Sequence, residues 1–219
     1  MAHHIVLTFD DACRSHLTTV APELRRYGFG ATFFICRFDD DYRRQFGNTL
    51  LAPDAIRELS AMGLDIGNHT WSHRDLRAET PDAIRSDLRR MQDFLTAAGV
   101  PECRSFAYPG GPYAENAAPV LRDFGFRFAR TTERRLYAPG VDDPLRLPAI
   151  PIQHEDPAPF QAALAMLDAA PEDQVLILVY HGVPDEVHPH VNTPPEIFRA
   201  QLAEMAERGY RATGLAALL

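Results

Sequence analysis

The chain has 219 residues with a formal net charge of −8, and 46% of its residues are hydrophobic while 24% are charged. This length and composition are typical of one globular domain with a substantial core, which we expect residues 1–219 to form. The acidic balance, without any cluster of Lys and Arg beyond short pairs, argues against nucleic acid or an anionic membrane surface as the partner.

Apolar runs that suit buried strands alternate along the chain with stretches that suit amphipathic helices. We expect strands at His4–Phe9, Ala31–Cys36, Leu64–Gly67, Ser105–Ala107, Phe126–Ala129, Val175–Tyr180 and Tyr210–Ala212. We expect helices at Ser15–Tyr27, Pro53–Met62, Thr80–Ala98, Glu115–Phe124, Pro157–Ala169 and Pro194–Arg208, several of which begin with Pro or end at Gly. Leu136–Asp156 and Val183–Pro195 are expected to be long irregular loops.

This alternation predicts an α/β fold. The strand runs are almost wholly apolar, which is the pattern of a parallel sheet covered by helices. Neither GxGxxG nor a P-loop opens the first unit, and this favours a barrel over an open doubly wound sheet. In such barrels the catalytic groups lie at the carboxyl ends of the strands.

The compartment and the redox state can also be estimated. The N-terminus lacks a basic segment followed by an apolar one, and no stretch is long and apolar enough to span a membrane, so we expect a cytoplasmic protein. The chain has three cysteines, Cys13, Cys36 and Cys103. Because their number is odd and none of them forms a CxxC motif, a disulfide framework is not expected.

Two carboxylates and two histidines follow predicted strands. Asp10 and Asp11 end the first strand, and His69 and His73 follow the third, four residues apart as on one helical turn. Two imidazoles and one carboxylate with open positions are the ligand set of a catalytic zinc site. A cation on one Asp would relieve the repulsion between the pair, and the other would be free to take a proton from water.

A third histidine ends the last long strand. The run VLILVYHGV places His181 at the same predicted end of the barrel. It could be a further metal ligand or a general acid for a leaving group. We favour the acid, because the three-ligand set is already complete.

The motifs TFDD at Thr8–Asp11 and HTWSH at His69–His73, with the strand ending in His181, resemble the polysaccharide deacetylase family. These are carbohydrate esterases of family 4, with the chitooligosaccharide deacetylase homology domain. The resemblance implies a distorted (β/α) barrel with seven or eight parallel strands, forming one catalytic domain. It also implies a divalent metal, Zn2+ in the first place with Co2+ or Ni2+ as alternatives, and hydrolysis of acetyl groups on sugars.

The resemblance further implies a role for each motif residue. Asp10 corresponds to the catalytic base, and Asp11 corresponds to a metal ligand beside His69 and His73. His181 corresponds to the general acid that protonates the departing amine. Water on the metal is then the nucleophile that attacks the acetyl carbonyl.

The family's third motif is altered. It usually reads RxPYG, but here the stretch is FAYPGGPY, and Ala107 stands where the Arg is expected. That Arg normally pairs with the catalytic Asp, and Arg130 and Arg14 are the two candidates to replace it; both alternatives stay open. Gly110 would supply the N–H of the oxyanion hole. The residues expected to line a small substrate pocket are Tyr108, Tyr113 and Tyr180.

The family's fourth motif, which carries an acid that orients the general-acid histidine, has no match. The candidates for that acid are Asp142, Asp143, Glu155 and Asp156. The loop histidines His154, His188 and His190 are expected to lie outside catalysis.

Three functions remain open at this point. The first is a metal-dependent hydrolase of C–N bonds, other than peptide bonds, that removes acetyl groups from N-acetylated sugars. The second uses the same site on cyclic ureides or imidates, and the third is a metal-binding relative without catalysis. The expected partner is a small-molecule or oligosaccharide substrate, and the sequence does not indicate an oligomeric state.

Overall fold

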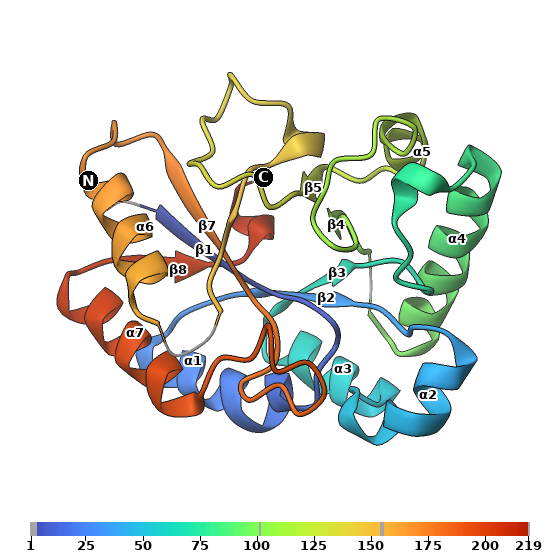
Figure 1. The fold of residues 1–219 in the computed structure, drawn as a ribbon, viewed down its shortest axis with the longest axis horizontal. Helices are drawn as coiled ribbons and strands as arrows, with labels where there is room; N and C mark the ends of the chain where they lie inside the picture. Colours follow the sequence, from blue (N-terminus) through green and yellow to red (C-terminus); the bar gives the residue numbers. More distant parts are fainter. Residues whose placement is uncertain (1–3, 101, 154–155, 219) are drawn as a thin grey trace.

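The computed structural model describes residues 4–100, 102–153 and 156–218, and its centre is one curled sheet (Figure 1). The strands are β1 (His4–Phe9), β2 (Thr32–Ile35), β3 (Asp65–Asn68), β4 (Ser105–Ala107), β5 (Phe128–Arg130), β6 (Ile150–Pro151), β7 (Val175–Tyr180) and β8 (Arg211–Thr213). They pair in parallel. This confirms the expected distorted (β/α) barrel.

The strand order places β1 in the middle of the sheet. The order is β5-β4-β3-β2-β1-β7-β6, and β8 pairs with β1. β7 pairs with β1 along its whole length, whereas β8 pairs with the first half of β1 and β2 with its last two residues. Leu147 forms a parallel bridge with Arg130 shortly before β6 begins. The chain leading into β6 therefore brings the two ends of the strand order together.

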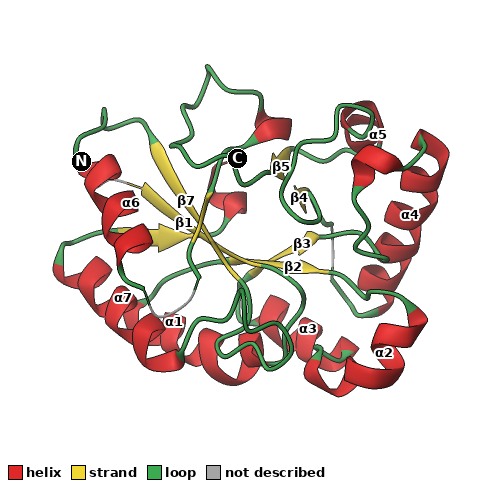
Figure 2. Ribbon diagram, viewed as in Figure 1, coloured by secondary structure: helices red, strands yellow, loops and turns green. Residues whose placement is uncertain are grey.

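Helices surround the sheet (Figure 2). They are α1 (Ala21–Tyr27), α2 (Asp40–Phe46), α3 (Pro53–Ala61), α4 (Pro81–Ala97), α5 (Ala118–Asp123), α6 (Ala158–Asp168) and α7 (Pro195–Glu207). All the expected helices are present, with ends shifted by a few residues. The expected helix Ser15–Tyr27 begins with a π-helical turn at His16–Val20 before it continues as α1.

Two elements were not expected from the sequence. The stretch DDYRRQF forms α2, although none of its residues is buried; Asp39 caps it by accepting a hydrogen bond from the Tyr42 amide at 2.7 Å. The prediction of an irregular connection over Leu136–Asp156 is wrong in part. This stretch contains a 3₁₀ turn and the two-residue strand β6, whose apolar run at 147–152 holds two prolines and so does not read as a strand.

The larger core lies between the strands and the helices, and a smaller buried cluster, which includes Val6, Phe34 and Ile177, lies on the other face of the sheet. Every residue of β7 is buried, and in β1 only His4 is exposed. The cysteines Cys13, Cys36 and Cys103 are free thiols, as expected. Among the described residues, no helix is both long enough and apolar enough to cross a membrane.

Candidate active site

Asp10 and Asp11 leave the carboxyl end of β1 in different directions. The Asp10 amide still continues the ladder to the carbonyl of Tyr180 at 2.9 Å, but Asp11 and Ala12 have positive φ values of 72° and 51°. Such values are unusual for residues other than Gly, and they mark a sharp turn. Both carboxylates are buried, so each needs a partner of opposite charge or a cation.

His69 and His73 meet at Asp11, but not on a helical turn. The predicted helical geometry is wrong, since the chain after β3 is a loop in which Thr70 and His73 have φ values of 64° and 55°. The Thr70 hydroxyl accepts a hydrogen bond from the His73 amide at 3.0 Å, and Asp87 accepts three from Trp71 and Ser72. These contacts fold the loop back so that the two imidazoles converge.

The three side chains form a compact donor set for a cation. Oδ1 of Asp11 lies 3.7 Å from Nε2 of His69 and 3.2 Å from Nε2 of His73. Two ligands at about 2.1 Å from a tetrahedral zinc ion lie roughly 3.4 Å apart, so these separations fit. Nδ1 of His69 is 2.8 Å from the carbonyl oxygen of Ala107, which can only accept; Nδ1 therefore carries the proton and Nε2 is left with a lone pair.

The electrostatics of Asp11 and His69 agree with their place in the donor set. Burial would raise the pKa of Asp11, but the hydrogen bond from His73 and the nearby histidines outweigh it, and the pKa lies well below its usual value. Burial lowers the pKa of His69 to about 4, so its imidazole is neutral near pH 7. A carboxylate and a neutral imidazole are the forms that bind a metal.

Asp10 is paired with Arg130. Nη2 of Arg130 donates to both carboxylate oxygens, and both side chains are buried. Burial alone would raise the pKa of Asp10, yet Arg130 and the neighbouring histidines hold it below its usual value. Of the two arginines left open by the sequence, Arg14 is excluded, because it pairs with Glu186 at the surface at 3.4 Å.

His181 approaches the same carboxylates from β7. Its Nε2 lies 3.9 Å from Oδ2 of Asp11, while its Nδ1 has no hydrogen-bond partner in the part of the chain that the structure describes. The predicted acids are engaged elsewhere: Asp142 accepts from Arg135 and Ala138, Asp143 from Leu145, and Asp156 from Ala158. Glu155 lies outside the described residues.

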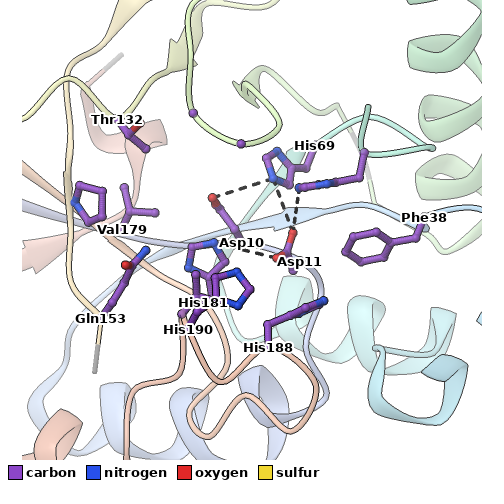
Figure 3. A pocket seen from close by; sticks show the side chains of 15 residues that line it. Asp10, Asp11, Phe38, His69, Thr132, Gln153, Val179, His181, His188 and His190 are labelled. Carbon is purple, nitrogen blue, oxygen red and sulfur yellow. Dashed lines mark ion pairs between the residues drawn. The ribbon is translucent and has the colours of Figure 1, made fainter. Parts of the chain in front are cut away.

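These groups share one cavity of about 440 Å³ at the carboxyl ends of the strands (Figure 3). Its lining includes the residues Asp10, Asp11, His69, His73, Gly110, Gly111 and His181. The predicted pocket tyrosines do not line it. Tyr108 is buried with its hydroxyl on the Leu145 carbonyl, Tyr113 lies beside Arg146, and the Tyr180 hydroxyl donates to Gln201 in the core.

Other cavity residues were missed in the sequence. They are Phe38, Thr132, Pro151, Gln153, Val179, His188, His190 and Val191. His188 and His190 were expected to be non-catalytic, and that prediction stays untested although both line the cavity; His154 lies outside the described residues. The Asp185 carboxylate accepts a hydrogen bond from the His188 amide at 2.7 Å, and the same oxygen lies 3.5 Å from Nδ1 of His188. For His188 and His190, the signal in the sequence was the Pro- and His-rich composition of the loop Val183–Pro195.

Comparison with known proteins agrees with this geometry. Residues 2–129 match a family model described as polysaccharide deacetylase. A chitooligosaccharide deacetylase from Rhizobium leguminosarum bv. trifolii is 30% identical over 96 residues, which cover 43% of this chain and 40% of that protein. The chain also spans only 44% of the length of a matching Bacillus subtilis protein. These proteins therefore share a segment of their length with this chain rather than the whole of it.

Solved structures show the same fold. A family 4 acetyl xylan esterase from Clostridium thermocellum, in complex with a cobalt ion, has a TM-score of 0.61 at 22% identity and covers 98% of this chain and 89% of that one. A CE4 family pseudoenzyme from Bacillus anthracis has a TM-score of 0.67 at 17% identity and covers 99% of this chain and 65% of that one. Since identity is this low, these likenesses concern the fold alone.

Proposed function

The chain belongs to the polysaccharide deacetylase family, and on that premise we propose that it is a metal-dependent hydrolase that removes acetyl groups from N-acetylated sugars. The observation that supports this most is the convergence of Asp11, His69 and His73, whose ligand atoms all lie within 4.8 Å of one another. A carboxylate that is not part of this set, Asp10, lines the same cavity.

The donor set suits a divalent cation with open coordination positions. Two imidazole nitrogens and one carboxylate oxygen favour Zn2+, and Co2+ or Ni2+ would also be accepted. When bound, such an ion would polarise an acyl carbonyl and lower the pKa of water. Asp11, His69 and His73 would hold it.

The remaining residues carry protons and hold the substrate. Asp10 takes a proton from water as the water oxygen bonds to the acyl carbon, and Arg130 keeps Asp10 ionised until then. The amide N–H of Gly110 stabilises the oxyanion. When the C–N bond breaks, His181 gives a proton to the leaving nitrogen, so acetate and a free amine are released.

Two observations favour the alternative of a non-catalytic role. Ala107 replaces the family's arginine, and Nδ1 of His181 has no partner within the described residues. Against that role, the buried pair of Arg130 and Asp10 supplies what Ala107 lacks. A pure metal-binding site would not need this second carboxylate.

A substrate panel with metal reconstitution tests the proposal. We expect the protein loaded with one equivalent of Zn2+ to release acetate from N-acetylated chitooligosaccharides, and the chelated protein to release none. Release of ammonia or ring opening from an allantoin-like ureide, without acetate release, would favour the cyclic substrates. Stoichiometric metal binding with no hydrolysis of either class would favour the non-catalytic role and overturn the proposal.

A further inference from the structure

Ser15 and His16, at the start of the π-helical turn that precedes α1, hold the backbone on either side of Gly182. Nε2 of His16 lies 3.1 Å from the carbonyl oxygen of His181. The Ser15 hydroxyl accepts a hydrogen bond from the Val183 amide at 2.9 Å. Because these contacts link positions more than 160 residues apart, they fix the chain that carries His181 against the loop that carries Asp10 and Asp11.

The protonation of His16 follows from its partner. A carbonyl oxygen only accepts, so Nε2 must carry the hydrogen and Nδ1 must be bare. Nδ1 is buried and has no partner among the described residues. Burial lowers the pKa of His16 to about 4, which leaves the ring uncharged near pH 7.

His16 is otherwise surrounded by aromatic core. The side chain is fully buried, and its ring centroid lies 5.6 Å from that of Phe9 and 5.2 Å from that of Phe33. A phenylalanine would suit this environment better for stability, since an orphaned polar nitrogen in the core is destabilising. The position therefore holds a residue that is worse for packing but able to donate one hydrogen bond.

We propose that His16 is a positioning residue for His181, and that its Nε2–H fixes the backbone from which the His181 imidazole enters the cavity. The inference rests on the proposed proton-donor role of His181. It explains how that ring is directed although its own Nδ1 has no partner in the described chain. His16 does not line the cavity, so it acts through His181 rather than on the substrate.

Variants of His16 separate positioning from packing. His16→Phe keeps the aromatic shape and removes the donor, whereas His16→Gln places an amide N–H near the position of Nε2. We expect H16F to lower kcat at least tenfold with KM and metal content unchanged, and to melt at or above the wild-type Tm. H16Q should recover most of the lost kcat, and Ser15→Ala should lower kcat in the same sense but less.

Other results would overturn the inference. If H16F keeps the wild-type kcat, the hydrogen bond does not position His181. If H16F loses Tm and kcat together and H16Q does not recover kcat, His16 is only a packing residue.

Amide hydrogen exchange tests the inference even if the proposed function fails and the wild-type protein hydrolyses nothing in the panel. In H16F the Val183 amide should exchange at least tenfold faster while the strand amides of β1 keep their wild-type rates. Unchanged exchange at Val183 would overturn the positioning role by itself.

Discussion

Arg130 and Asp10 form a buried ion pair in which one guanidinium nitrogen donates to both carboxylate oxygens. Arg130 ends β5, and its register partner on the neighbouring strand β4 is Ala107. Ala107 is the position at which the third motif of the family holds its arginine. The Arg130 guanidinium therefore reaches Asp10 from β5 rather than from β4, the strand that holds Ala107, and it does so from the position that pairs with Ala107.

Replacing Arg130 with Met should affect both stability and the acid limb of the pH–rate profile. Removing one partner of a buried ion pair costs about 3–5 kcal/mol of unfolding free energy, because Asp10 is left buried and unpaired. The pKa of Asp10 is now held down largely by Arg130, so it will rise in the variant. Asp10 will then be protonated at higher pH, and the acid limb of kcat should move to higher pH.

The double variant R130M/D10N is the control for that experiment. It lacks the unpaired charge, so urea unfolding should show it more stable than R130M alone, while its turnover should fall well below that of R130M because the proton acceptor is lost. An acid limb that does not move in R130M, measured by acetate release, would contradict the pairing as the cause of the Asp10 ionisation.

Asp10→Asn should leave the metal content unchanged and Asp11→Asn should lower it, although the two residues are adjacent. D10N keeps the donor set and should bind one equivalent of metal, but turnover should fall by roughly 10²–10⁴ because the proton acceptor is lost. D11N removes a ligand and should lose most of its metal. Elemental analysis after dialysis distinguishes them, and a D10N protein with wild-type turnover would show that the base is another group.

His73→Gln and His190→Gln form a matched pair, since both histidines line the cavity but only His73 belongs to the donor set. H73Q should lose metal affinity, and its Tm should no longer respond to chelator. For the wild type, a metal at 100 times its Kd adds about 2.7 kcal/mol of stability, so chelation should lower its Tm. H190Q should behave like the wild type, and an equal loss of affinity in both variants would contradict the assigned ligands.

The parts of the fold that could be predicted are those with a local signal. The long apolar runs of β1 and β7 and the Pro and Gly at helix ends are visible in the sequence and were placed to within a few residues. The strand β6 was missed because the apolar run around it, at 147–152, holds two prolines, which argue against a strand. The helix α2 was missed because none of its residues is buried, so its sequence shows a cap and charge pairs rather than the pattern of a helix that faces the core.

The site divides in the same way. Asp11, His69 and His73 stand in recognisable motifs, so the donor set was predictable even though its helical geometry was not. The role of Arg130 depends on which residue of β5 pairs with Ala107, and register is a property of the assembled sheet. The contact between His16 and His181 joins two distant segments, and nothing local to His16 indicates it.

The titration of His16 predicts a pH dependence of stability in the metal-free protein. Its pKa is about 4 when folded and about 6.5 in an unfolded chain, so between these values the unfolded chain binds the extra proton. Unfolding free energy should therefore fall as pH is lowered from 6.5 to 4, by an amount on the order of 3 kcal/mol from this group. In H16F the contribution of this group to the pH dependence of the unfolding free energy should vanish, whereas the contribution of His69 should remain.

Urea unfolding at several pH values measures this difference. Plots of unfolding free energy against pH for the wild type and H16F should differ in slope between pH 4 and 6.5 and be parallel above pH 6.5. Parallel curves throughout would show that His16 is protonated in the folded state, and its Nε2 would then not be restricted to the neutral tautomer.

Gly111 should be the least replaceable glycine of the cavity, for two separate reasons. Its φ of 97° is unfavourable for other residues, and a Cβ there would lie 2.1 Å from Oγ1 of Thr132. Gly125→Ala measures the backbone cost of a positive φ alone, because Gly125 has a φ of 80° and nothing lies within 4 Å of the added carbon. We expect G125A to lose about 1 kcal/mol of unfolding free energy and G111A to lose about 1–3 kcal/mol more.

Thr132→Ala in the G111A background tests the second reason. It removes Oγ1 and Cγ2, the two atoms closest to the added carbon, and should return part of the lost stability. A double-mutant cycle should therefore give a coupling of about 0.5–3 kcal/mol between the two positions, whereas T132A should show none with G125A. If G111A and G125A lose equal stability, the turn beside Gly110 has room to move, and its amide would not be held in place for an oxyanion.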